Sequence, residues 1–333
     1  MTRSIFSAVS ILSAMICASA HAGGNFGEPA PDFPPGVFSD GGHYQMSDFE
    51  GKLVVLFFFE SECPTCKGTI PKRNEVMQQF KDKPVKFIAV GPHNSLNEVK
   101  AYITETKLAM PVFADNLNIM ESMYGQTISL RNIYQFRVVG PDGRVMAYDM
   151  SPAEINKCLA QVKWKYKDQG YDPQLNGIID MLEWNQFVPA MNQLRPLRKS
   201  QRKPLAESAE KLYQAIHAEG EKWKQEADKL LAEKPVAAAD LYARIATVFT
   251  GDDLAKTVAE LIKTLKANKQ VVDEMAARQA YAQLYTAVPK ARMQQREQVA
   301  QFCTTVAGKY PGTPTGEKAK ALAEAIAAAP NAQ

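Results

Sequence analysis

Cysteine is scarce in this sequence, which contains only five cysteines among 333 residues. Disulfide scaffolds are much denser in cysteine, so the fold must depend on apolar cores instead. Hydrophobic residues form 46% of the chain, which is enough to fill such cores. A chain of this length predicts two domains.

An excess of charge of one sign is also absent. The 39 basic and 36 acidic residues leave a net charge of +3, which gives no electrostatic reason to bind nucleic acid. The one basic cluster runs from Arg195 to Lys203, beside Pro196 and Pro204. We interpret this cluster as part of a solvated linker.

Apolar runs long enough to span a membrane are missing. Residues 1–22 have the pattern of a signal peptide, with Arg3 as its positive end, residues 5–17 as its apolar centre and Ala20-His21-Ala22 as a cleavage site. The apolar centre is shorter than the about 20 residues that cross a bilayer. We therefore expect a periplasmic or secreted protein with no membrane span after signal cleavage.

Patterns of metal ligands are missing as well. No second paired-cysteine motif accompanies Cys63 and Cys66, and the four histidines show no ligand spacing. Nothing resembles a nucleotide or flavin site. We expect no metal site and no cofactor, although capture of a metal or cluster by the two thiolates stays open as a third hypothesis.

What the sequence does contain is the motif Cys63-Pro64-Thr65-Cys66. It follows the apolar run Leu53–Phe59 and opens a helical stretch, where free N–H groups and the helix dipole favour a thiolate. This placement predicts a redox-active dithiol, with Cys63 as nucleophile and Cys66 as resolving thiol. Half of a metal site or an inert structural disulfide are the alternatives.

The apolar run over residues 53–59 shows no alternation, which is typical of a central strand covered on both faces. Residues 23–42 are rich in glycine and proline and should form an extended lead-in without regular elements. Further strands are predicted at residues 85–90, 111–114, 136–139 and 145–148. Helices are predicted after the dithiol, with a kink at Pro71, after Ser95, over residues 117–124 and after Ser151.

The second half contains no convincing strand. From Leu205 to Leu230, apolar residues recur at three- and four-residue steps, which predicts one long helix. Residues 241–265 and 302–326 show a faint repeat that is typical of paired helices in a TPR-like solenoid. We divide the chain into a signal peptide (1–22), an α/β domain (23–165), a helical linker (166–204) and an all-α domain (205–333).

Several motifs together resemble the thioredoxin-like superfamily, in particular the exported TlpA/ResA-type reductases and the AhpC/TSA redoxins. The resemblance covers about residues 27–165 and includes the dithiol, Pro71 and two further segments, Gly27-Glu28-Pro29-Ala30-Pro31-Asp32-Phe33 and Phe49-Glu50-Gly51-Lys52. It implies a central mixed sheet flanked by helices, with Cys63 exposed at a helix start and Cys66 more sheltered. The helical C-terminal region lies outside it.

The sequence departs from that family at three places around the dithiol. The family's usual cis-proline position aligns with Tyr134, and no proline lies between Pro111 and Pro141. The connection over residues 124–134 is about four residues longer than usual, by comparison with the family. Glu62 replaces the aromatic residue that commonly precedes the first cysteine.

The residues around the dithiol shape its chemistry. Glu60 and Glu62 oppose a second negative charge beside Cys63, whereas Lys67 and the helix start favour it. We therefore treat Pro64, Thr65, Glu62, Lys67, Pro71 and Tyr134 as residues that shape the site.

Three functions follow as hypotheses. The first is an exported thiol–disulfide oxidoreductase that acts on protein thiols or disulfides and depends on an external electron donor. The second is a scaffold in which the helical region binds a protein partner and folds on its own. A thiol-dependent peroxidase is a runner-up only, because Glu60 stands where such redoxins carry Thr or Ser. Cys158 and Cys303 are interpreted as isolated buried thiols.

Overall fold

The computed structural model of the protein describes residues 24–329, together with every side chain in this range except that of Tyr134. The predicted signal peptide, residues 1–22, lies outside the described residues. Within the described range, no helix is both long and apolar enough to cross a membrane.

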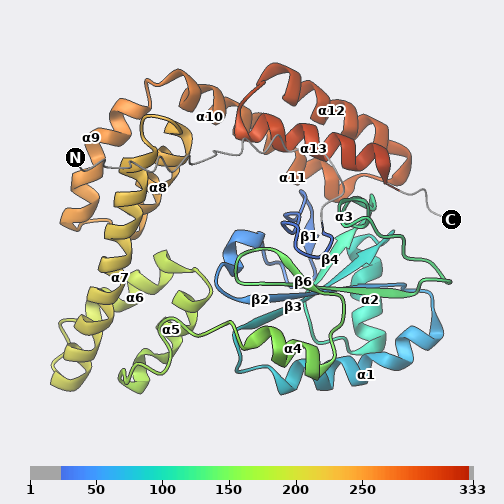
Figure 1. Ribbon diagram of the computed structural model, residues 1–333, viewed down its shortest axis with the longest axis horizontal. Helices are drawn as coiled ribbons and strands as arrows, with labels where there is room; N and C mark the ends of the chain where they lie inside the picture. Colours follow the sequence, from blue (N-terminus) through green and yellow to red (C-terminus); the bar gives the residue numbers. More distant parts are fainter. Residues whose placement is uncertain (1–23, 330–333) are drawn as a thin grey trace, which may run out of the picture.

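A six-stranded mixed sheet forms the centre of the first half of the chain (Figure 1). The strand order is β1-β4-β3-β2-β5-β6. The three central strands β2, β3 and β4 run parallel, and the other three are antiparallel to their neighbours. The strands are β1 (Val37–Phe38), β2 (Leu53–Phe59), β3 (Val85–Pro92), β4 (Val112–Asp115), β5 (Tyr134–Val139) and β6 (Val145–Ala147).

All seven residues of β2 are buried, which confirms the predicted central strand. Its odd-numbered residues face a core shared with α1 (Pro64–Gln79), α2 (Leu96–Thr106) and α4 (Pro152–Leu159). Its even-numbered residues face a second core.

The short helix α3 (Ile119–Met123) and the N-terminal lead-in cover that second face. The lead-in is not free of regular structure, because β1 lies within it and pairs with β4. Phe33, Phe38 and Phe113 pack their rings together and hold β1 at the sheet edge. The absence of regular elements predicted for residues 23–42 is therefore wrong at β1.

From residue 148 to residue 329 the described chain is helical and contains no strand of the sheet. Figure 1 shows these helices as an arch that leaves the sheet, extends away from it and returns over α3 and β1. The α-helices are α5 (Asn176–Glu183), α6 (Phe187–Leu197), α7 (Lys203–Leu230), α8 (Pro235–Val248), α9 (Asp253–Leu265), α10 (Lys269–Tyr281), α11 (Leu284–Ala287), α12 (Arg296–Lys309) and α13 (Pro314–Ala328).

The two segments that suggested a repeat each fold as two helices joined at a glycine. Gly251 lies between α8 and α9 and Gly312 between α12 and α13, both with positive φ angles (88° and 74°). Glycine adopts this left-handed conformation without steric strain. The paired helices agree with the predicted unit, while an evolutionary repeat stays a prediction.

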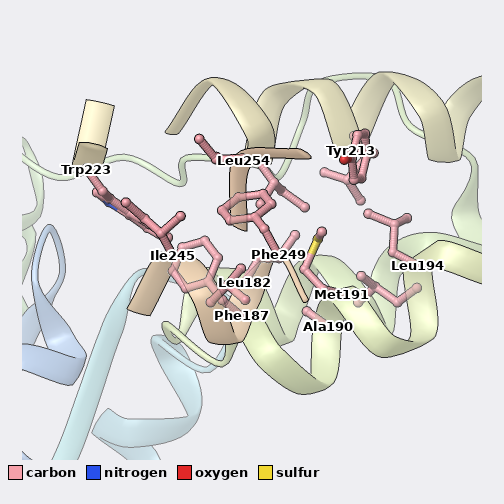
Figure 2. Close-up of a cluster of buried hydrophobic side chains, with 14 of the residues drawn as sticks. Leu182, Phe187, Ala190, Met191, Leu194, Tyr213, Trp223, Ile245, Phe249 and Leu254 are labelled. Carbon is pink, nitrogen blue, oxygen red and sulfur yellow. The ribbon is translucent and has the colours of Figure 1, made fainter. Parts of the chain in front are cut away.

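A large apolar core joins helices α5 to α9 (Figure 2). In it, the rings of Phe187 and Trp223 meet edge to face, with centroids 4.9 Å apart. A Cβ atom at Gly220 would lie 2.4 Å from the ring of Phe249. The close approach of α8 and α9 to α7 therefore leaves no room for a side chain at this position.

The basic cluster spans the end of α6 and the turn that leads into α7, where Lys199, Arg202 and Lys203 are exposed as the linker interpretation expects. Arg195 lies on α6 and donates from Nη2 to the carbonyl of Val248 at 2.7 Å. Arg198 pairs with Glu210 on α7 at 2.6 Å, and Arg202 pairs with Asp172. Arg195 and Arg198 thus connect the end of α6 to α8 and α7, and Arg202 connects the start of α7 to the segment before α5.

A buried ion pair ties the start of the arch to the sheet. Lys52, one residue before β2, lies 2.7 Å from the carboxylate of Glu183 on α5, and both side chains are almost completely buried. The same carboxylate accepts three hydrogen bonds from the consecutive backbone amides of residues 165–167. Burial opposes its ionisation, but Lys52 and the amides prevail and lower the pKa of Glu183.

The end of the arch is tied to the sheet by a shared core. Leu117 and Ile119, which follow β4, are buried among residues of α10 to α13. The amide of Asn116 donates to the carbonyls of Val288 and Ala291, at 2.9 and 2.6 Å. This core therefore contains residues from both halves of the chain. That the helical region folds on its own, as the scaffold hypothesis expects, stays a prediction.

The substitution Glu183→Ala tests whether the buried Lys52–Glu183 ion pair stabilises the fold. It leaves the Lys52 ammonium buried without its carboxylate, so we expect the free energy of unfolding to fall by about 3–5 kcal/mol in urea titrations. The control is Glu207→Ala, which removes an exposed pair with Lys203 and should change stability by less than about 1 kcal/mol. Equal effects of the two substitutions would contradict this role.

Candidate functional site

Titratable residues gather at one edge of the sheet, where the three parallel strands end. Glu60 follows β2, His93 follows β3, and Asp115 is the last residue of β4. The carboxyl ends of parallel strands are the usual place for a functional site in an open α/β sheet. The dithiol lies at this edge, three residues beyond Glu60.

Cys63 is the N-cap residue of α1, with extended backbone angles (φ −78°, ψ 113°). Its Sγ accepts a hydrogen bond from the backbone N–H of Cys66 at 3.3 Å. Pro64 occupies the first helical turn, where its missing N–H has no consequence, and both Pro64 and Thr65 are exposed. The sulfur of Cys63 thus accepts the capping hydrogen bond that a side-chain oxygen usually accepts at the start of a helix.

The two thiols differ in their exposure to solvent. Cys63 is 7% exposed and Cys66 only 1%. The resemblance implied an exposed Cys63, and the structure shows that it is only slightly accessible because its side chain turns back to cap α1. The more sheltered position of Cys66 agrees with what the resemblance implied.

Cys66 is held at the base of the site by the residue before β5. Its Sγ donates to the carbonyl of Ile133, with 3.9 Å between sulfur and oxygen. Burial, with smaller contributions from Cys63 and Glu60, raises the pKa of the Cys66 thiol to about 12. Cys66 is therefore a protonated thiol at neutral pH.

The charged residues predicted to shape the site lie around this dithiol. Glu62 is exposed, and its backbone N–H donates to the carboxylate of Glu60 at 3.1 Å. Lys67 turns toward α2, where its ammonium contacts both carboxylate oxygens of Glu105 at 2.8 and 2.9 Å. Lys67 thus forms an ion pair with a residue 38 positions away in the sequence, which the motif alone did not predict.

Pro71 and Tyr134, two further residues predicted to shape the site, lie on α1 and at the start of β5. Pro71 lies inside α1, five residues after Cys66. Tyr134 opens β5 opposite Phe59, so its backbone follows directly on the carbonyl that contacts Cys66. The backbone of residues 133 and 134 therefore lies beside Cys66.

A buried polar cluster that the sequence analysis missed lies at the same edge. Asn118 accepts from the backbone N–H of His93 through Oδ1 at 2.7 Å, which directs its amide nitrogen at His93 Nδ1, also at 2.7 Å. Because that nitrogen donates, Nδ1 accepts, and the proton of the neutral ring is on Nε2. His93 Nε2 lies 3.7 Å from Glu121 Oε2.

Two carboxyl groups of this cluster are completely enclosed. Asp115 accepts from the backbone amides of Ile119 and Glu121, and Glu121 accepts from that of Ile128. Burial raises the pKa of each carboxyl to about 7 in spite of these bonds. Burial also lowers the pKa of His93. Polar residues directly after two predicted strands were the signal that could have revealed the cluster.

Among residues 24–329, no group of three or more His, Cys, Asp and Glu side chains has a geometry suited to hold a metal ion. The predicted lone cysteines Cys158 and Cys303 are both unpaired and buried. Cys158 lies on α4 and Cys303 on α12, each within an apolar core.

Comparison with known proteins identifies the first half of the chain. Residues 26–147 match the AhpC/TSA family. The thiol–disulfide oxidoreductase ResA of Oceanobacillus iheyensis is 33% identical over 101 residues, which cover 29% of this chain and 53% of that protein. ResA of Geobacillus thermodenitrificans is 29% identical over 139 residues, which cover 41% of this chain and 78% of that protein. The chain thus spans about half the length of the first of these relatives.

Solved structures also match the sheet-containing part. The thioredoxin domain of a thiol–disulfide oxidoreductase from Bacteroides vulgatus is 21% identical (TM-score 0.35, 40% of this chain, 96% of that chain). A thiol:disulfide interchange protein from Chlorobium tepidum is 23% identical (TM-score 0.33, 40% and 94%). The sheet order, the dithiol and the family match together make this part a thioredoxin-like redoxin domain, followed by a helical C-terminal region.

The difference between the thiols predicts selective alkylation. At pH 8 a thiol with a pKa of about 12 is thiolate in about one molecule in ten thousand, so iodoacetamide should modify Cys63 at least about tenfold faster than Cys66. Peptide mass mapping of the reduced protein over time measures both rates. Faster modification of Cys66 would contradict the arrangement.

The buried carboxyls predict a particular pH dependence of stability. Their folded pKa lies above the unfolded value, so the folded state binds more protons between about pH 4 and 7, and the free energy of unfolding falls as the pH rises through this range. Asp115→Asn should flatten this slope in urea titrations at pH 5 to 8. Asp253→Asn, which removes an exposed carboxyl on α9, should leave it unchanged. An unaltered slope in Asp115→Asn would refute the assignment.

Proposed function

We propose that this protein is an exported thiol–disulfide oxidoreductase whose thioredoxin-like domain exchanges disulfides with protein substrates through Cys63 and Cys66. The observation that carries the proposal is the asymmetry of the pair. One sulfur caps a helix on a residue that is 7% exposed, and the other belongs to a residue that is 1% exposed and contacts the carbonyl of Ile133.

In the first step the Cys63 thiolate attacks one sulfur of a substrate disulfide. A bond forms between the two sulfurs, the substrate S–S bond breaks, and the released substrate thiolate takes a proton. The backbone N–H of Cys66 points at the sulfur that carries the negative charge before attack. The product of this step is a mixed disulfide between Cys63 and the substrate.

In the second step Cys66 gives up its proton and attacks Cys63. The mixed disulfide breaks, the substrate leaves with both sulfurs reduced, and a Cys63–Cys66 disulfide remains. Burial disfavours the Cys66 thiolate, so this thiol stays protonated until the substrate is bound. Two electrons pass to the substrate, and an external dithiol must return them before the next cycle.

Export is part of the proposal and is supported by the signal pattern of residues 1–22. The relatives with similar sequences are thiol–disulfide oxidoreductases, which supports protein thiols or disulfides as the substrate class. We further propose the domain boundaries given above and the roles of Pro64, Thr65, Glu62, Lys67, Pro71 and Tyr134 in shaping the site. The identity of the electron donor is left open.

Trapping of the mixed disulfide tests this function. Cys66→Ala should accumulate substrate proteins linked to Cys63, visible on non-reducing gels and released by dithiothreitol. Cys63→Ser should lower the rate of exchange with a protein disulfide at least about a hundredfold, because no other described thiol is accessible at this edge.

Cys158→Ser is the matched control, because this buried thiol on α4 takes no part in the proposed exchange. It should keep the wild-type rate. Unchanged exchange in Cys63→Ser, together with no trapped species in Cys66→Ala, would overturn the assignment. Efficient reduction of hydrogen peroxide without exchange on proteins would favour the peroxidase hypothesis instead.

A further inference from the structure

The longer connection before β5 ends in a tight hairpin with Leu130 and Arg131 at its tip. Ser129 and Asn132 exchange two backbone hydrogen bonds, at 3.2 and 2.9 Å. The Asn132 side chain donates to the carbonyl of Thr127 at 2.7 Å, and Ser129 Oγ accepts from the N–H of Arg131 at 3.3 Å. Four bonds within six residues hold the tip in a defined position.

This hairpin is joined directly to the dithiol. The residue after it, Ile133, accepts through its carbonyl from the Cys66 thiol and also from the backbone N–H of Glu60, at 2.8 Å. Consecutive Cα atoms are about 3.8 Å apart, so the Cα of Leu130 lies at most about 11 Å from that of Ile133. The tip of the hairpin therefore lies within a few residues' length of the carbonyl that contacts the dithiol.

Leu130 is 71% exposed, more than any other large hydrophobic residue among those described. Single exposed apolar residues are common on protein surfaces and need no explanation by themselves. Leu130 differs because a rigid turn presents it next to a reactive thiol. Because its side chain is mostly in solvent, Leu130 does not help to fill a hydrophobic core.

Charged side chains of both signs lie around the site. Glu62 is exposed directly before Cys63, Glu60 is half-buried two residues earlier, and Arg131 is exposed beside Leu130 on the hairpin. In the range 24–329 neither Glu62 nor Arg131 takes part in an ion pair with another residue. The two acidic groups give no attraction for an acidic segment, and the one basic group lies beside an exposed apolar side chain, which adds an apolar contact to the selection.

We propose that Leu130 is a specificity determinant that docks an apolar side chain of the substrate protein. The occupant is an extended segment around the substrate cysteine, with an aliphatic or aromatic residue within three positions of it. An extended chain advances about 3.3–3.6 Å per residue, so three positions match the reach from Ile133 to Leu130. This inference rests on the proposed function and adds the class of substrate to it.

Two disulfide-linked peptides that differ at one position test the inference. In one, leucine lies two residues from the cysteine, and in the other serine replaces that leucine. Wild-type protein should reduce the leucine peptide with about a tenfold higher kcat/KM, because part of one leucine side chain leaves water on binding. Leu130→Ser should reduce this preference to less than about twofold.

Met275→Ser is the matched control, because Met275 is 58% exposed but lies on α10 in the helical region. It should keep the wild-type preference. Hydroxyethyl disulfide, which is too small to reach the hairpin, should react at equal rates with wild type and both variants. This last measurement reports on the dithiol alone and shows that the variant is folded.

The outcomes separate the inference from the proposed function. A tenfold preference that persists in Leu130→Ser, or no preference in the wild type, would overturn the docking role of Leu130. If hydroxyethyl disulfide is still reduced in that case, the proposed redox function is unaffected. Failure of the wild type to reduce any of the three disulfides would overturn both.

Discussion

The carbonyl of Ile133 is the point on which the site depends. It receives the Cys66 thiol from α1 and the backbone N–H of Glu60 from the end of β2, and it belongs to the residue that leads into β5. One oxygen thus joins the helix that carries the dithiol, the central strand and the strand beside it. Cys66 is buried beside this carbonyl, and burial keeps its thiol protonated, which makes the two thiols unequal.

Burial has a second consequence at this edge of the sheet. Asp115 and Glu121 keep their protons up to about neutral pH, close behind a site whose chemistry moves protons between sulfurs. Asn118 fixes the neutral tautomer of His93 beside them. The same segment then continues into Leu117 and Ile119, which hold the end of the helical arch. The redox edge and the helical region are therefore connected through residues 115–121.

Patterns that depend on neighbouring residues were predictable from the sequence. The uniform apolar run gave β2 its central place, and Ser95 with Glu98 forms the predicted capping box of α2. Cys63 opens α1 as the motif indicated. What could not be predicted depends on residues distant in sequence, such as Lys52 with Glu183 and Lys67 with Glu105. A single sequence carries no signal for such pairs, because each partner alone looks like an ordinary surface charge.

The central claim is that Cys63 and Cys66 form one reversible two-electron couple. The most direct measurement is an equilibrium titration of the intact protein against mixtures of reduced and oxidised dithiothreitol or glutathione, followed by the mass of the alkylated protein. The account predicts a single transition in which both thiols change together, with a slope for two electrons. Cys66→Ala should lack this transition, because its remaining thiol at the site can form only a mixed disulfide with the redox reagent. Two thiols that stay reduced at every potential, or that oxidise independently, would contradict it.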